Sequence, residues 1–191
     1  MEVKAPWLRF YCNTPAHLDY PDQSMCDLLE ETAAKHPDLV ACEFLGHQYR
    51  YPELVREVHR CAKALRALGV RPGDRVALWL PNTPAYPVLL FACARLGAIA
   101  VAVNTRYRAV EVADIVGRSG AKVLACAPGF RSIDFLAILA DIEPQALDGL
   151  SALVTVGGEP SSIPPAIERL RRAKAPRGGK VSGSDGAVTP P

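Results

Sequence analysis

Motifs typical of metal sites and of secreted proteins are missing from this sequence. The six cysteines are spread widely and none forms a C-x-x-C pair, so neither a zinc site nor a thioredoxin-like redox site is predicted. The four histidines show no metal-binding spacing with one another or with cysteine. Residues 1–19 contain no continuous apolar segment of the kind found in a secretory signal. We therefore expect free thiols in a reducing, cytoplasmic setting.

A continuous apolar run suited to a bilayer is also lacking. Residues 85–103 come closest, but Arg95 lies in their middle, where membrane insertion of a charge costs roughly 2.5–3.5 kcal/mol. Pro87 and Gly97 interrupt the run further. We predict a buried helix followed by a buried strand in this segment, and no transmembrane segment.

The sequence has no excess of charge of one sign. Its formal net charge is +2 over 191 residues, which gives no global field to attract nucleic acid. The basic residues between positions 169 and 180 have no aromatic side chain among them on which a base could stack. A nucleic-acid partner is therefore not predicted.

The sequence does contain a regular alternation of helix and strand signals. Helices are predicted where apolar residues recur every three or four positions, over residues 24–36, 52–69, 83–97, 109–119 and 132–140. Strands are predicted where short apolar runs occur, over residues 40–45, 48–51, 75–80, 98–103, 122–126 and 152–156. Ser24 and Asp27 have the spacing of a capping box, and Asn82 or Thr83 can cap the third helix. A tight turn at Gly46-His47 joins the first two strands into a hairpin.

The order of these elements predicts the fold class. Strand, helix and strand in succession form a crossover unit, and its repetition predicts an α/β fold with a doubly wound, mostly parallel sheet and flanking helices. The strand over residues 75–80 is expected at the centre, because its almost continuous apolar character suits a strand covered on both faces. Residues 1–156 are predicted to form one lobe, and the Gly, Pro and Arg-rich tail over residues 157–191 is predicted to be disordered.

Several short motifs in fixed order between residues 49 and 127 carry a family resemblance. They are Tyr51-x-Glu53-Leu54, Ala64-Leu65-x-x-Leu68-Gly69-Val70, Pro72-Gly73-Asp74-x-Val76-Ala77, Pro81-Asn82-x-Pro84, Leu96-Gly97-Ala98, Val103-Asn104-x-Arg106 and Ser119-Gly120-Ala121-Lys122-Val123-Leu124. Together they resemble the N-terminal part of the AMP-forming acyl-CoA synthetases and other adenylate-forming enzymes. Most of these residues also have structural roles: Gly69 and Gly97 end helices, and Asp74 and Asn82 satisfy turn or cap donors.

The resemblance implies a two-step reaction, but the sequence lacks some of the motifs that this reaction needs. Members of the family join a carboxylic acid to ATP with Mg²⁺, release pyrophosphate and transfer the acyl group to CoA. Their phosphate loop reads Ser/Thr-Gly-Thr-Thr-Gly-x-Pro-Lys, and it has no counterpart among these residues. The nearest imitation, Ser182 to Gly186, lacks the threonines and the lysine, and Asp185 would place a negative charge beside the phosphates. No catalytic or metal-binding residue is predicted, and neither ATP nor Mg²⁺ is assigned to the chain.

One residue is a candidate for ligand binding. The resemblance implies that Arg106 lies near the phosphates of CoA, which suits the planar donor fork of a guanidinium. The alternative is that Arg106 and Arg108 only solvate a loop at the end of a strand.

Three functional hypotheses remain open at this stage. The first is the leading, truncated portion of an acyl-CoA synthetase for a fatty acid or related acid, inactive alone, with a gene break or frameshift before the tail. The second is a non-catalytic module that associates with itself or with a full-length synthetase through exposed surface. The third is a fragment of a peptide-synthetase adenylation domain.

Overall fold

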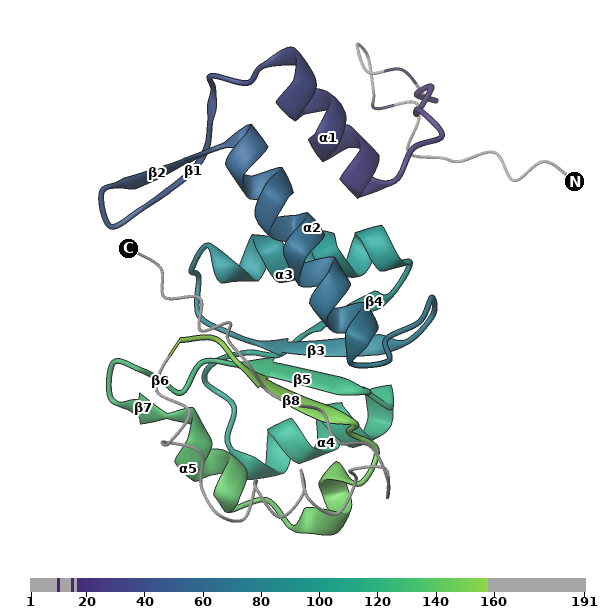
Figure 1. Ribbon diagram of the computed structural model, residues 1–191. Helices are drawn as coiled ribbons and strands as arrows, with labels where there is room; N and C mark the ends of the chain where they lie inside the picture. Colours follow the sequence, from purple (N-terminus) through teal and green to yellow (C-terminus); the bar gives the residue numbers. More distant parts are fainter. Residues whose placement is uncertain (1–9, 11–14, 16, 158–191) are drawn as a thin grey trace, which may run out of the picture.

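The computed structural model describes residues 10, 15 and 17–157 (Figure 1). The tail predicted for residues 157–191 therefore lies outside the described residues except for Gly157. The helices are α1 (Met25–Lys35), α2 (Tyr51–Ala67), α3 (Ala85–Leu96), α4 (Ala109–Ser119), α5 (Phe135–Ala140) and the short 3-10 helix η2 (Pro144–Leu147). The strands are β1 (Val40–Phe44), β2 (His47–Arg50), β3 (Arg75–Trp79), β4 (Ile99–Ala102), β5 (Val123–Cys126), β6 (Gly129–Phe130), β7 (Ile133–Asp134) and β8 (Ala152–Thr155).

Four parallel strands form the main sheet, in the order β4-β3-β5-β8. Helices α2 and α3 cover one face of the sheet, and α4 and α5 cover the other (Figure 1). Strand β3 lies between two neighbours, and its residues from Val76 to Trp79 are fully buried. The α/β, doubly wound fold predicted from the sequence is thus confirmed, as is the central place of β3.

Strand β4 corrects one expectation. It was predicted to be buried, but it lies at the edge of the sheet, and the side chain of Ile99 is 53% exposed. The sequence of a parallel strand covered by helices is a short apolar run at the edge of a sheet as well as at its centre. The sequence pattern therefore identified the strand without revealing its position in the sheet.

The start of α1 follows its sequence signal. The hydroxyl of Ser24 accepts from the backbone N–H of Asp27 at 3.1 Å, and the carboxylate of Asp27 accepts from the backbone N–H of Ser24 at 2.9 Å. This reciprocal pair is the predicted capping box, which satisfies two donors that the first helical turn leaves unpaired.

The start of α3 differs from the prediction of a side-chain cap. Neither Asn82 nor Thr83 is the N-cap, because the helix begins at Ala85 after Pro84, and Pro84 has no side chain that could cap. Instead, the carbonyl oxygen of Thr83 accepts from the backbone N–H of Tyr86 at 2.9 Å. A tight backbone turn thus replaces the side-chain cap. The helix ends as predicted, with Gly97 in the left-handed conformation.

The β1–β2 hairpin turns one residue earlier than predicted. The two turn residues are Leu45 and Gly46, with φ of 51° and 82°, and His47 already belongs to β2. Two successive positive φ angles are characteristic of the turn type whose twist matches that of a hairpin. The sequence identified Gly46 correctly as a turn residue. Leu45 was not predicted to be in the turn, because leucine rarely occupies the left-handed region.

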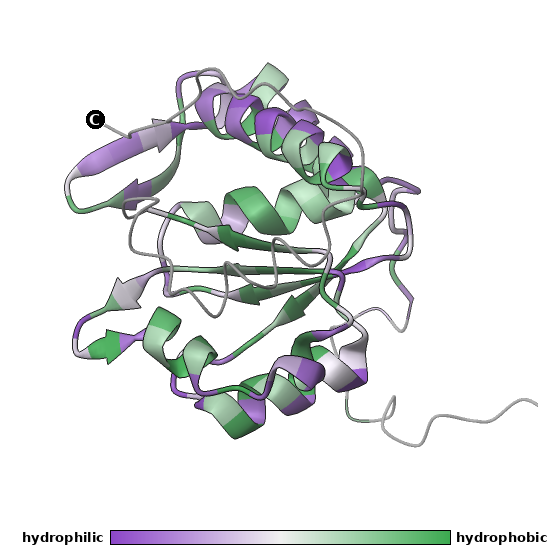
Figure 2. Ribbon diagram, turned by 60° about the horizontal axis from the view of Figure 1, so that its bottom comes forward, coloured by the Kyte–Doolittle hydropathy of each residue, from purple (hydrophilic) through white to green (hydrophobic). Residues whose placement is uncertain are grey.

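Two apolar cores hold the helices in place. The larger core lies between the sheet and its flanking helices, while a smaller one joins α1 to α2 through Cys26, Leu29, Leu54 and Val58. Figure 2 shows hydrophobic residues concentrated in the strands and hydrophilic residues on the outer helices and the β1–β2 hairpin. Among residues 17–157, no helix combines the length and the apolar character that crossing a bilayer requires.

Candidate functional site

The carboxyl edge of the sheet is the place where this topology brings loops together. The strands are in register there, since Trp79 pairs with Cys126 and Cys126 pairs with Thr155. From β3 the chain crosses to β4 on one side and then returns to β5 on the other. Such a switch point between neighbouring parallel strands leaves a crevice at their carboxyl ends, where open α/β sheets bind ligands. The β1–β2 and β6–β7 hairpins lie at this same end of the molecule (Figure 1).

Arg106 lies on a tight turn at this edge, directly after β4. The side-chain oxygen of Asn104 accepts from the backbone N–H of Arg106 at 2.9 Å. The carbonyl oxygen of Asn104 accepts from the backbone N–H of Tyr107 at 3.1 Å and from the indole N–H of Trp79 at 3.1 Å. The turn backbone is therefore fixed by three hydrogen bonds. The exposed guanidinium of Arg106 makes no hydrogen bond or ion pair within residues 17–157.

Arg108 differs from Arg106 in this respect. Its guanidinium donates to the carbonyl oxygens of Arg106 at 2.8 Å and Tyr107 at 3.2 Å. Its backbone N–H donates to the carboxylate of Glu111 at 3.0 Å at the start of α4. Hydrogen bonds from the backbone amides of Glu111 and Arg108 hold the pKa of the Glu111 carboxyl below its usual range. Arg108 thus stabilises the turn, whereas the guanidinium of Arg106 takes no part in holding it within the described residues.

A shallow hollow of about 280 Å³ opens beside the β3–α3 loop. Residues of β1, of the β3–α3 loop and of the start of α3 line it: Cys42, Glu43, Phe44, Asn82, Thr83, Pro84, Tyr86 and Pro87. Burial raises the pKa of the Cys42 thiol, so this thiol stays protonated at neutral pH and is a weak nucleophile. The hollow is therefore lined by apolar residues, neutral polar residues and one acidic residue, Glu43.

The described residues offer no donor set for Mg²⁺. Within residues 17–157 no group of three or more His, Cys, Asp or Glu side chains is placed to hold a metal ion. Mg²⁺ requires oxygen ligands, usually one or two carboxylates together with substrate phosphates. The metal that the family resemblance implied therefore does not fit this part of the chain.

At the opposite, amino edge of the sheet, Asp74 holds the turn that precedes β3. Its carboxylate accepts from the backbone N–H of Arg71 at 2.7 Å and from the ammonium of Lys122 at 2.9 Å. The same ammonium donates to the carbonyl oxygen of Gly69 at 2.8 Å. The hydrogen bond from Lys122 is the main reason that the pKa of Asp74 is lowered. The predicted structural role of Asp74 is confirmed.

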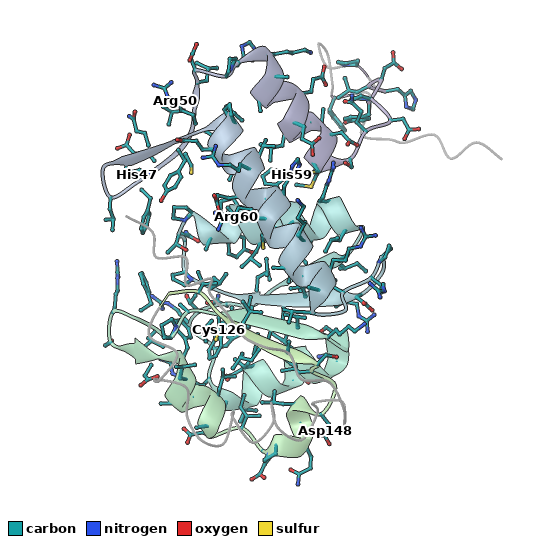
Figure 3. The ribbon with its side chains drawn as sticks, in the orientation of Figure 1. His47, Arg50, His59, Arg60, Cys126 and Asp148 are labelled. Atoms are coloured by element: carbon teal, nitrogen blue, oxygen red, sulfur yellow. The ribbon has the colours of Figure 1, made fainter. Side chains whose placement is uncertain are left out.

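Sequence reasoning missed a polar cluster that joins three helices. One carboxylate oxygen of Glu30 on α1 accepts from Arg95 on α3 at 2.7 Å and lies 2.8 Å from Nε2 of His59 on α2. Figure 3 shows His59 in the region between α1 and α2. Glu30 and Arg95 are separated by 65 positions, so no local spacing could have indicated their contact. The role of Trp79 in holding the Asn104 turn was missed for the same reason.

Comparison with known proteins gives a consistent result. The family model described as AMP-binding enzyme matches residues 29–177. Triostin synthetase I of Streptomyces triostinicus is 36% identical over 145 residues, which cover 72% of this chain and 28% of that protein. Feruloyl-CoA synthase of an Amycolatopsis species is 46% identical over 96 residues, which cover 50% of this chain and 20% of that protein.

A solved structure supports the same assignment at the level of the fold. A fatty acyl-CoA synthetase of Mycobacterium tuberculosis is similar with a TM-score of 0.61 and 32% identity, over 78% of this chain and 28% of that one. The chain thus spans between 20% and 28% of the length of these three relatives.

Proposed function

Since the chain belongs to the AMP-binding enzyme family, we propose that it forms the first part of the N-terminal domain of an acyl-CoA synthetase. The complete enzyme would join a fatty acid or related carboxylic acid to ATP and then transfer the acyl group to CoA. The observation that carries this proposal is the exposed guanidinium of Arg106, which has no partner among the described residues and lies on a hydrogen-bonded turn at the carboxyl edge of the sheet.

Arg106 would bind a phosphate group of CoA in this proposal. A guanidinium donates two parallel N–H bonds to a phosphate, and these charge-assisted bonds are roughly twice as strong as neutral ones. Three hydrogen bonds hold the backbone of the turn, so little entropy would be lost in positioning it when CoA binds. Free thiols at Cys26, Cys42, Cys61, Cys93 and Cys126 support a reducing, cytoplasmic setting.

We propose further that the 191-residue polypeptide alone forms no acyl-adenylate. A triphosphate needs a cradle of backbone amides, a lysine and a divalent cation to balance its charge. The sequence contains no phosphate loop of the family type, and the Ser182–Gly186 imitation lies outside the described residues. This polypeptide would thus supply a contact to CoA but not the chemistry of adenylation.

Calorimetric titration with CoA tests the role of Arg106. Arg106→Gln should weaken CoA binding by about tenfold or more, which corresponds to about 1.4 kcal/mol or more. Arg118→Gln is the matched control, because Arg118 is exposed on α4 and pairs with Asp114 of the same helix. The Arg118→Gln variant should bind CoA as tightly as the unsubstituted chain. Pantetheine, which carries no phosphate, should not bind. Equal CoA affinity for the Arg106→Gln and Arg118→Gln variants would contradict the proposal.

A peptide-synthetase adenylation domain is the second candidate, favoured by the similarity to triostin synthetase I. The two candidates differ in the acyl acceptor, which is CoA in one case and the pantetheine arm of a carrier protein in the other. The CoA titration separates them, because a carrier arm lacks the phosphoadenosine group of CoA. Pantetheine binding as tight as CoA binding would favour the second candidate.

Association with a second copy or with a full-length synthetase stays a prediction. The outer edges of β4 and β8 pair with no other strand among the described residues. Unpaired sheet edges offer rows of backbone donors and acceptors to another chain, which supports such an association.

A further inference from the structure

Trp79 occupies an unusual position for a core aromatic residue. It is the last residue of β3, its side chain is fully buried, and its ring packs edge-on against Phe135 of α5 with centroids 4.6 Å apart. A leucine or phenylalanine would also fill an apolar site, but only tryptophan brings an indole N–H there. That N–H donates to the carbonyl oxygen of Asn104 at 3.1 Å, so a buried donor of the central strand is directed at the turn after the edge strand.

The accepting carbonyl is the centre of the Arg106 turn. The same oxygen accepts from the backbone N–H of Tyr107, while the side-chain oxygen of Asn104 accepts from the backbone N–H of Arg106. The indole bond therefore links this turn to the main core through Trp79 and Phe135. The other two bonds close the turn on itself. Two bonds attach it to β3: the backbone N–H of Val103 donates to the carbonyl oxygen of Leu78 at 3.0 Å, and the indole N–H donates to Asn104 within the turn.

We propose that Trp79 is a positioning residue: its indole N–H fixes the turn that carries Arg106 and so prepares Arg106 to bind phosphate. This inference rests on the proposed function for the identity of the ligand. A buried indole N–H usually finds a partner, so a merely structural role would require only that Trp79 be satisfied. A positioning role requires in addition that the order of the turn depend on Trp79.

Amide hydrogen exchange, followed by NMR, distinguishes the two roles. Trp79→Phe keeps an aromatic ring against Phe135 and removes only the N–H and part of the ring volume. Exchange of the Arg106 and Tyr107 amides should become about three to ten times faster, because one hydrogen bond of ordinary strength is lost. Phe135→Leu is the matched control, since it weakens the core but keeps the indole bond, and exchange at these two amides should not change.

CoA affinity is then compared for the same two variants. CoA should bind the Trp79→Phe variant about three to ten times more weakly, and the Phe135→Leu variant with unchanged affinity. If the unsubstituted chain does not bind CoA, the proposed function fails, and hydrogen exchange alone decides whether Trp79 orders the turn. Unchanged exchange at the amides of Arg106 and Tyr107 in the Trp79→Phe variant would overturn the inference.

If the Trp79→Phe variant does not fold, 3-benzothienylalanine at position 79 replaces it in the same experiment. This residue has the shape of tryptophan but lacks the N–H.

Discussion

At the scale of single residues, Glu30 makes polar contacts that the sequence did not predict. Its carboxylate is shared by Arg95 and His59, and the thiol of Cys26 lies 3.5 Å away. The hydrogen bond with His59 is the main cause that lowers the pKa of Glu30. Burial and the hydrogen bond to Glu30 raise the pKa of the Cys26 thiol to about 11. Glu30 is therefore the residue that joins α1 to α2 and α3 by polar contacts.

Replacing Glu30 should affect stability in a pH-dependent way. Glu30→Gln should lower the free energy of unfolding at pH 7 by about 0.5–1 kcal/mol, because partly exposed ion pairs contribute little each. A carboxyl whose pKa is lowered on folding stabilises the protein above its unfolded pKa, and this stabilisation is lost as the pH falls through its folded pKa. The difference between the two proteins should therefore shrink on acidification. Urea unfolding over a pH series measures it.

Glu31 provides the control for this prediction. Its carboxylate pairs with Lys35 of the same helix, so Glu31→Gln should cost no more than about 0.3–0.5 kcal/mol. If Glu31→Gln destabilises the protein as much as Glu30→Gln, the contacts of Glu30 with α2 and α3 add no more to the free energy of unfolding than an ion pair within one helix.

At the scale of elements, the end of α4 shows how a glycine connects a helix to the sheet. Gly120 follows α4 with φ of 59°. Its carbonyl oxygen and that of Ser119 accept from the guanidinium of Arg75 on β3, at 2.7 and 2.8 Å. A Cβ atom at Gly120 would lie 2.6 Å from Nη2 of Arg75. The backbone conformation thus requires glycine here, and a Cβ atom would in addition displace the guanidinium of Arg75 from its hydrogen bonds.

Two alanine substitutions in this region should have opposite effects. Gly120→Ala should lower the free energy of unfolding by about 1–2 kcal/mol, because alanine is strained in the left-handed region and would displace Arg75. Gly117→Ala, inside α4 where a Cβ meets no atom within 4 Å, should raise it by about 0.5–1 kcal/mol, as alanine favours helix. Thermal and urea unfolding of both variants check the signs. Destabilisation by Gly117→Ala, or none by Gly120→Ala, would contradict this account.

The elements also show which features a sequence can predict. The bounds of α4 were predicted correctly because Gly120 marks its end locally, and the capping box of Ser24 made the start of α1 equally clear. Strand β4 was placed along the chain but not within the sheet, because edge position depends on which strands become neighbours. The Trp79–Asn104 and Glu30–Arg95 contacts join residues 25 and 65 positions apart, so only the folded chain brings them together.

At the scale of the whole molecule, the candidate site was predicted only in part. Arg106 was chosen because its motif resembles that of a family. The structure adds that, within the part of the chain it describes, the guanidinium of Arg106 has no partner while that of Arg108 has. The division into residues 1–156 and a tail stays a prediction.

The central claim is that this polypeptide contributes to CoA recognition without supplying a site for adenylation. Acid-dependent ATP–pyrophosphate exchange tests it most directly, with the purified 191-residue chain, a panel of fatty and aromatic acids, and a mock purification to control for contaminating synthetase. The account predicts no exchange above the mock sample with any acid. Exchange that depends on one acid and exceeds the mock sample would contradict it.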